Sequence, residues 1–318
     1  MVCLKRIAVM CLFYTTFIVH AKKNDLFDPR IVGGDECEYE KYPFAVAIFT
    51  NLVCGGVIIS KRWVLTAAHC INFQYIRSGR TLLRTGFNYD QHFVQIRFAV
   101  KAICHKNFNI YRMGDIEQPE LRYDIALILN NKPFDETRYL KRAFLPEPGF
   151  TNKCAEATAV GVGYRSEVFY FQRSENLAAL TRDPLETEYN RTLQCVELPI
   201  IDTETCKETW PTSVLDSTVI CTRVEEGGRD ACSGDSGGGL FYENTVIGII
   251  SAGRGCAMPK LAATYSKVES YLDFIKETMQ NNAASQPSVT LLGTQPPCLF
   301  KSVKSLPASP NNVSEERP

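Results

Sequence analysis

Cysteine content is the feature of this sequence that most restricts its fold. Thirteen cysteines are scattered through 318 residues. Two of them, Cys3 and Cys11, lie in residues 1–21, where a basic start and a short apolar run predict a cleaved secretory signal peptide rather than a membrane anchor. An exported chain matures under oxidising conditions, so most of the other cysteines should form disulfides. Their scattered spacing and the small number of histidines, four, argue against a zinc site.

Residues 31–280 have the pattern of an all-β unit. Short apolar segments rich in β-branched and aromatic residues recur between turn residues, at 44–49, 57–60, 99–103, 125–129, 196–201 and 246–251. Closely spaced strands of this kind predict a sandwich or a pair of barrels. Apolar residues at helical spacing predict one amphipathic helix, over 268–279, that docks on the core. The polar residues 281–318 predict a disordered tail.

A glycine-rich segment supplies a candidate nucleophile. Ser236 lies in Gly234-Asp235-Ser236-Gly237-Gly238. Glycines on both sides let the backbone turn sharply and approach a substrate, so that neighbouring N–H groups can converge on one oxygen. A turn without chemistry is the alternative interpretation. Cys232 and Asp230 just upstream make the segment more specific than a lone Gly-x-Ser-Gly.

Two further residues complete a candidate catalytic set. His69 follows an apolar run and small residues and precedes Cys70, which predicts a fixed position at the end of a strand. Asp124 opens an apolar strand, where a buried carboxylate needs a donor such as an imidazole N–H. Taken singly, a structural histidine and a turn-forming aspartate are the alternatives. Acyl transfer needs a nucleophile, a base and a group that orients the base, and Ser236, His69 and Asp124 offer one of each.

These segments together resemble the chymotrypsin–trypsin family of serine proteases. The resemblance runs from Ile31 to about Met279 and rests on five matches in order: Ile31–Gly34, the His69, Asp124 and Ser236 segments, and Ser251–Cys256. It implies two antiparallel six-stranded β-barrels, residues 31–143 and 144–280, with the site between them and a C-terminal helix. It also implies that His69, Asp124 and Ser236 form the triad and that the N–H groups of Gly234 and Ser236 form the oxyanion hole.

The resemblance further implies activation by cleavage. Arg30-Ile31 has the form of an activation site, which makes residues 22–30 a propeptide and Ile31 a new N-terminus. The released α-amino group would pair with Asp235 and so order the oxyanion loop. The activator would cut after arginine, so self-activation and an upstream protease both stay open.

Specificity is expected to come from Asp230, six residues before Ser236. In the family this position is the floor of the primary pocket. A poorly hydrated carboxylate there predicts cleavage after arginine or lysine, because an apolar side chain would leave it unpaired. A solvated aspartate is the alternative. Ser251, Gly253 and Ala263 are expected to contact the substrate. Ala263 replaces the glycine of trypsins and Ala252 a common tryptophan, so the balance between arginine and lysine and the extended specificity stay open.

The resemblance also implies four disulfides: Cys54–Cys70, Cys206–Cys221, Cys232–Cys256 and Cys37–Cys195. Cys104, Cys154 and Cys298 are left over. Because snake-venom members of the family tether a C-terminal extension to a cysteine near this position, we hypothesise a bridge between Cys104 and Cys298. Cys154 would then be unpaired or intermolecular.

The remaining expectations concern ligands, partners and modification. No cofactor and no metal are expected, because Phe87–His92, where some trypsins bind calcium, is short and nearly without carboxylates. Asn190 and Asn312 open glycosylation sequons, which are either used or unused. With 35 basic and 35 acidic residues, the chain should attract neither nucleic acid nor a membrane. We expect an extracellular monomer with protein or peptide substrates and protein protease inhibitors as partners. A non-catalytic binding protein on the same fold is the alternative function.

Overall fold

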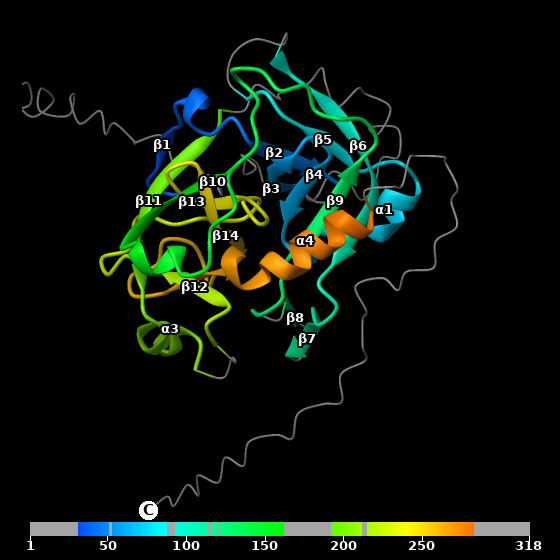
Figure 1. Ribbon diagram of the computed structural model, residues 1–318. Helices are drawn as coiled ribbons and strands as arrows, with labels where there is room; N and C mark the ends of the chain where they lie inside the picture. The colour runs from blue at the N-terminus through cyan, green and yellow to red at the C-terminus, as the bar shows by residue number, and fades with distance from the viewer. Residues whose placement is uncertain are drawn as a thin grey trace, which may run out of the picture.

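The computed structural model describes residues 31–50, 53–87, 93–113, 116–119, 121–161, 192–211 and 215–282 (Figure 1). The expected signal peptide, propeptide and sequons, and nearly all of the expected tail and calcium-loop positions, lie outside these residues. Among the helices that are described, none is long and apolar enough to span a membrane.

Six antiparallel strands close the first barrel. In barrel order they are β2 (Ala45–Phe49), β3 (Val53–Ser60), β4 (Trp63–Thr66), β9 (Ala126–Asn130), β6 (Ile96–Cys104) and β5 (Leu82–Arg84). Every residue of β4 and β9 is buried, because one face of these strands lines the barrel and the other is covered. Two candidate site residues adjoin these strands: His69 follows β4, and Asp124 precedes β9.

The second barrel closes in the same way. Its ring consists of β11 (Gln194–Ile201), β10 (Glu156–Gly161), β13 (Gly239–Tyr242), β14 (Thr245–Ala252), β15 (Ala263–Lys267) and β12 (Val219–Thr222), and β12 pairs back onto β11. The short N-terminal strand β1 (Asp35–Glu36) pairs with β11 outside the ring. The fold predicted from the resemblance, two six-stranded antiparallel barrels, is confirmed.

The described part of the chain ends just after the C-terminal helix, which packs against the opposite barrel. α4 (Leu272–Asn281) follows a 3₁₀ turn over Val268–Tyr271, so the α-helix begins four residues later than its apolar spacing predicted. Val268, Tyr271 and Ile275 join the core cluster that holds the first-barrel strands, and α4 runs beside β4 and β9 in Figure 1. The N-terminal strand and the C-terminal helix therefore each join a barrel distant from them in sequence.

The remaining elements are short. They are α1 (Phe73–Arg77), α3 (Thr203–Thr209), a two-stranded ribbon of β7 (Ile110–Met113) with β8 (Ile116–Pro119), and 3₁₀ turns over Tyr39–Lys41, Ala68–Cys70 and Phe150–Lys153. Asn72 caps the start of α1, and its side chain accepts hydrogen bonds from the N–H groups of Gln74 and Tyr75.

The four expected disulfides are present: Cys37–Cys195, Cys54–Cys70, Cys206–Cys221 and Cys232–Cys256. Cys37–Cys195 holds the N-terminal segment on β11, next to the β1 pairing. Cys154 is buried and free. Cys104 is disulfide-bonded. Because Cys298 lies outside the described residues, the Cys104–Cys298 bridge stays a prediction.

Candidate active site

Strand register brings His69 and Asp124 together. β4 ends at Thr66, which pairs with Ala126 at the start of β9. His69 lies in the 3₁₀ turn Ala68–Cys70 just beyond β4, and Asp124 lies just before β9. The Nδ1 atom of His69 is 2.7 Å from one carboxylate oxygen of Asp124, and the His69 backbone N–H donates to the other at 2.9 Å. Both the ring and the backbone of His69 are thus held by one carboxylate.

Asp124 is fully buried, and its oxygens are supplied with internal partners. The Ser251 hydroxyl donates to the same oxygen that faces His69, at 2.6 Å, and the Ser266 hydroxyl donates to the Asp124 backbone carbonyl at 2.8 Å. Burial alone would raise the pKa of Asp124, but the charge and hydrogen bonds of His69 and the bond from Ser251 lower it overall. Asp124 is therefore ionised at neutral pH.

The pKa of His69 shifts in the opposite direction to that of Asp124. Its side chain is 21% exposed. Burial alone would lower the pKa of His69, but the charge of Asp124 and the hydrogen bond to it outweigh burial and raise this pKa above the ordinary value. The carboxylate thus makes the imidazole a stronger base and fixes its orientation. Nδ1 faces Asp124, so Nε2 is the nitrogen left for a substrate or nucleophile.

An aromatic cluster that the sequence did not reveal holds the residue before Asp124. Tyr123 has a φ of 63°, a left-handed conformation that is costly for a bulky residue. Its N–H donates to the Tyr271 hydroxyl at 2.9 Å, and its ring stacks on His105 with centroids 4.9 Å apart. Phe274 packs edge-on against His105. The C-terminal helix region therefore helps to fix the backbone from which Asp124 projects.

The Ser236 loop is hydrogen-bonded to β3, the strand that pairs with β4. The N–H of Gly55, on β3, donates to the Ser236 carbonyl at 2.7 Å. The Cys70 sulfur lies 3.4 Å from that carbonyl oxygen and 3.8 Å from His69 Nε2, so the Ser236 backbone and the His69 ring meet around one atom. Ser236 itself is half-buried. The structure thus gathers Ser236, His69 and Asp124 at one place.

Glycine at two positions of this loop is required by its backbone. Gly234 and Gly237 have φ values of 89° and 81°, in the left-handed region. A side chain at Gly237 would also overlap Thr66 and the Gly55 carbonyl. Among the described residues, the N–H groups of Gly234 and Ser236 make no hydrogen bond within the protein, so both can donate to a ligand.

Asp235 lies on the inner side of the same loop and is fully buried. One of its carboxylate oxygens accepts the Cys232 N–H at 3.0 Å. Ile31 is also buried, at 7% exposure, and lies nearby, because a Cβ on Gly161 would overlap the Asp235 carboxylate and lie 2.8 Å from the Ile31 side chain. Asp235 and Ile31 thus share the space left by a missing side chain at position 161.

Asp230 is a third buried carboxylate, after Asp124 and Asp235, at 8% exposure. Its backbone forms a β-bridge with Val32, and one side-chain oxygen accepts the Ala257 N–H at 3.0 Å. Burial raises the pKa of Asp230 to about 6, against the opposing effect of the backbone N–H groups of Ala257 and Ala231. No lysine or arginine of the described chain pairs with it. The carboxylate is therefore available to a cation from outside.

Three other residues, Ala263, Gly253 and Ser251, are expected to contact the substrate. Ala263 is buried on β15 in the same core cluster as Tyr265 and Ala231. Gly253 is exposed just after β14. Ser251 is 5% exposed and its hydroxyl is committed to Asp124, so its side chain supports Asp124 rather than facing solvent.

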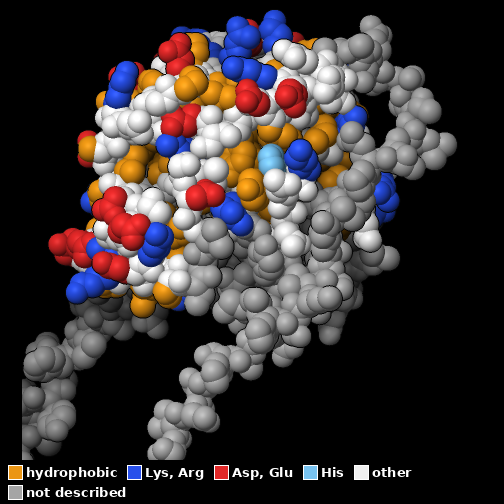
Figure 2. Space-filling view, turned by 60° about the horizontal axis from the view of Figure 1, so that its bottom comes forward, with side chains coloured by type: hydrophobic (Ala, Val, Ile, Leu, Met, Phe, Trp, Pro, Cys, Tyr) orange, Lys and Arg blue, Asp and Glu red, His pale blue; other side chains and the backbone are white. Residues whose placement is uncertain are grey.

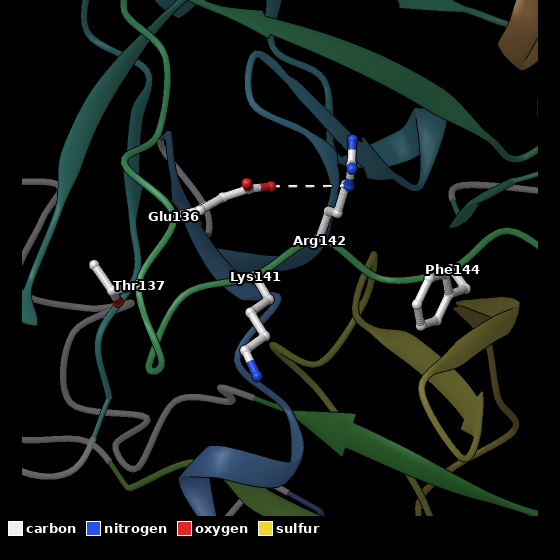
Figure 3. A pocket seen from close by; sticks show the side chains of 5 residues that line it. All are labelled: Glu136, Thr137, Lys141, Arg142 and Phe144. Atoms are coloured by element: carbon white, nitrogen blue, oxygen red, sulfur yellow. Dashed lines mark ion pairs between the residues drawn. The ribbon is translucent and has the colours of Figure 1, made fainter.

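Two other features do not belong to this chemistry. Figure 3 shows a surface hollow on the connection between the barrels, lined by Glu136, Thr137, Lys141, Arg142 and Phe144, none of them a candidate site residue. Cys54, His69 and Cys70 place possible metal-ligand atoms within 4.8 Å of one another. Because Cys54 and Cys70 are joined in a disulfide, neither offers the thiolate that a metal would need.

Comparison with known proteins agrees with this arrangement. The family model described as Trypsin matches residues 31–275. The chain therefore belongs to the trypsin family of serine proteases. Kallikrein-1 of Mus musculus is 35% identical over 261 residues, which cover 80% of this chain and 91% of the relative.

Other relatives cover the chain to the same extent. Tonin of Rattus norvegicus is 33% identical over 261 residues, with 80% of this chain and 91% of the relative covered. Kallikrein-11 of Homo sapiens is 32% identical over 260 residues, with 80% and 82% covered. The range matched by the family model takes in both barrels and the start of the C-terminal helix.

Proposed function

We propose that this protein is a secreted serine endopeptidase, made as a zymogen, that hydrolyses peptide bonds after arginine or lysine. The observation that carries the proposal is the hydrogen-bonded pair of His69 and Asp124 beside the Ser236 loop. Membership of the trypsin family supports a peptidase reaction. The four disulfides fit an oxidising compartment and so favour secretion.

In the proposed mechanism, Ser236 Oγ attacks the carbonyl carbon of the scissile bond and its proton passes to His69 Nε2. The carbonyl oxygen becomes an oxyanion, which the N–H groups of Gly234 and Ser236 stabilise. His69 then gives the proton to the leaving amine, and an acyl-enzyme remains on Ser236. Water repeats the sequence to release the acid. Asp124 keeps the imidazole in the productive tautomer and stabilises the imidazolium.

Activation would use Ile31. Cleavage at Arg30-Ile31 creates an α-amino group, which is mostly charged near neutral pH. The burial of Ile31 beside Asp235 supports a pair between this group and the Asp235 carboxylate. Such a pair would fix the Gly234–Ser236 backbone that forms the oxyanion hole. An arginine-specific protease, or the enzyme itself, would make the cut.

Primary specificity would rest on Asp230. Its carboxylate is buried and has no basic partner in the described part of the chain, so an incoming guanidinium or ammonium would satisfy it. An apolar side chain would leave the charge unpaired, which disfavours its binding. Ala263 adds a methyl group near this carboxylate and would bias the choice between lysine and arginine.

The test is an activity assay on protein that begins at Ile31. Matched substrates would carry arginine, lysine, phenylalanine or alanine before the scissile bond, with Ser236→Ala as the control. We expect cleavage after arginine and lysine that the control lacks. If the wild type cleaves none of the four substrates, the non-catalytic binding protein replaces the protease as the better proposal.

A further inference from the structure

Beyond cleavage after a basic residue, we propose that Arg254 forms a cationic subsite that selects acidic side chains upstream of the scissile bond. The inference rests on the proposed endopeptidase function and names a substrate class within it: peptides with glutamate or aspartate at the third or fourth residue counted back from the bond. It comes from a guanidinium that is held in place but has no carboxylate partner among the described residues.

Arg254 sits on a rigid aromatic platform. Its guanidinium carbon lies 5.1 Å from the centroid of the Trp210 ring. Trp210 is 2% exposed, and its indole N–H donates to the Ala262 carbonyl at 3.0 Å. A guanidinium stacked on a fixed ring loses little further freedom when it pairs with an anion. Arg254 itself is exposed, so its charge can be reached from solvent.

Three acidic residues of the described chain that follow or precede Trp210 in sequence are already paired. Glu208, at the end of α3, and Glu225 both contact Arg223, and Asp216 lies 3.7 Å from Arg122. Figure 2 shows acidic and basic side chains interspersed over the face that includes α3. Arg254 forms no ion pair within the described residues, so it offers an unneutralised positive charge.

The backbone beside Arg254 can receive a substrate strand. Gly253 is exposed, follows β14 directly and makes no hydrogen bond through its N–H or carbonyl in the described part of the chain. An extended peptide can add to such a segment by backbone hydrogen bonds. In antiparallel pairing with the cleaved residue opposite Ser251, the third residue back lies opposite Gly253 and the fourth opposite Arg254.

Alanine at position 252 keeps this approach open. Ala252 packs with Leu121 and Trp210 in one apolar cluster, and its small side chain places no bulky group between the substrate strand and the Arg254 platform. This chain lacks the tryptophan that is common in the family at this position. The Arg254 guanidinium lies over Trp210, in the cluster that Ala252 joins. The change favours an anionic substrate group over an apolar one.

The test compares substrates that differ only at the third or fourth residue, where each carries glutamate, glutamine or lysine before a fixed arginine at the cleaved position. An exposed ion pair contributes up to about 1 kcal/mol, which is about fivefold in kcat/KM. We therefore expect the wild type to favour glutamate over lysine about fivefold or more at one of the positions. Arg254→Gln should bring this ratio near one, Arg254→Glu should invert it, and added salt should weaken it.

Arg138→Gln is the matched control, since Arg138 is also an exposed arginine over an aromatic ring, at 4.4 Å from Tyr139, but lies on the connection between the barrels. It should leave the ratio unchanged. If arginine substrates are cleaved but all variants show equal rates with glutamate and lysine, the Arg254 subsite is wrong and the proposed function stands. If no substrate is cleaved, the proposed function itself fails and so does the subsite that rests on it.

Discussion

Asp124 and Asp230 are both buried carboxylates, yet their surroundings differ in kind. Asp124 is 0% exposed and receives the His69 ring, the His69 N–H and the Ser251 hydroxyl. Its pKa is lowered despite burial. Asp230 is 8% exposed and receives the Ala257 N–H, and burial raises its pKa to about 6. Hydrogen-bond donors of the protein replace the water that would solvate Asp124 in the unfolded chain. Asp230 is also removed from water but receives fewer such donors.

The difference separates a supporting role from a recognition role. A carboxylate with satisfied oxygens stays charged and keeps its neighbour in one orientation, as Asp124 does for His69. A carboxylate that is desolvated without a cation is destabilising until a cation arrives, as at Asp230. The contrast predicts that removing the first charge damages the chemical step, whereas removing the second damages the choice of substrate.

The largest expected effect is that of Asp124→Asn. It should lower kcat by about 10⁴-fold, the loss already known for this change in the family, with little change in KM. Without the carboxylate, burial acts alone on His69, so the pKa of His69 should fall. The acid limb of the kcat/KM profile should then move to lower pH. An unchanged limb with full activity would show that Asp124 does not control the imidazole.

Asp230→Asn should act on specificity instead. We expect kcat/KM for arginine substrates to fall by about 10³-fold, because the pocket would lose the charge that pairs with the guanidinium. Cleavage after phenylalanine should fall much less. The measurement is the ratio of kcat/KM for the two substrates in wild type and variant. Equal losses of kcat/KM for both substrates would mean that Asp230 stabilises the loop rather than selecting the substrate side chain.

The same substitution should stabilise the folded protein at neutral pH. The folded pKa of Asp230, about 6, exceeds the ordinary 3.8, so the folded state binds more protons than the unfolded state between these values and its stability falls as pH rises through them. Asp230→Asn should therefore increase the free energy of unfolding at pH 7 by about 1–3 kcal/mol. Denaturant titrations in a Ser236→Ala background would measure it, and the gain should vanish near pH 4.

The smallest effect is expected for the cluster behind Asp124. Tyr271→Phe removes the hydroxyl that accepts the Tyr123 N–H and loosens the backbone before Asp124. We expect kcat to fall by roughly threefold to tenfold with KM unchanged, since about 1 kcal/mol of hydrogen bonding is lost.

Tyr42→Phe is the control for this change, because the Tyr42 ring packs on Phe44 and Phe241 instead of on the Tyr123 cluster. It should leave kcat unchanged. Equal losses in the two variants, or a loss confined to KM, would count against the cluster as a support for Asp124.

Local sequence was enough to locate the triad candidates and several strands, among them β2, β9 and β14. His69 and Asp124 each adjoin an apolar strand, and pairing of β4 with β9 then places them together. The two-barrel arrangement and the disulfide pairs came from the family resemblance, since spacing alone leaves many connectivities open. The helix start was displaced because Val268–Tyr271 adopt the tighter 3₁₀ turn.

Contacts between distant segments could not be predicted. The hydrogen bond from Tyr123 to Tyr271 spans 148 residues, and nothing at either position indicates the other. The left-handed conformation of Tyr123 was equally hidden, because tyrosine rarely adopts it and only the surrounding cluster enforces it. The same holds for the hydrogen bond from the Ser251 hydroxyl to Asp124, which nothing at either position indicates.

The most direct test of the account is the binding of benzamidine, an amidinium that mimics the arginine side chain, measured by calorimetry at pH 6 in two buffers of different ionisation enthalpy. Because Asp230 has a pKa of about 6 when empty, binding of the cation should release about half a proton. Asp230→Asn should abolish both the release and most of the affinity. Tight binding to Asp230→Asn, with no proton released from the wild type, would contradict the claim that Asp230 is kept for a substrate cation.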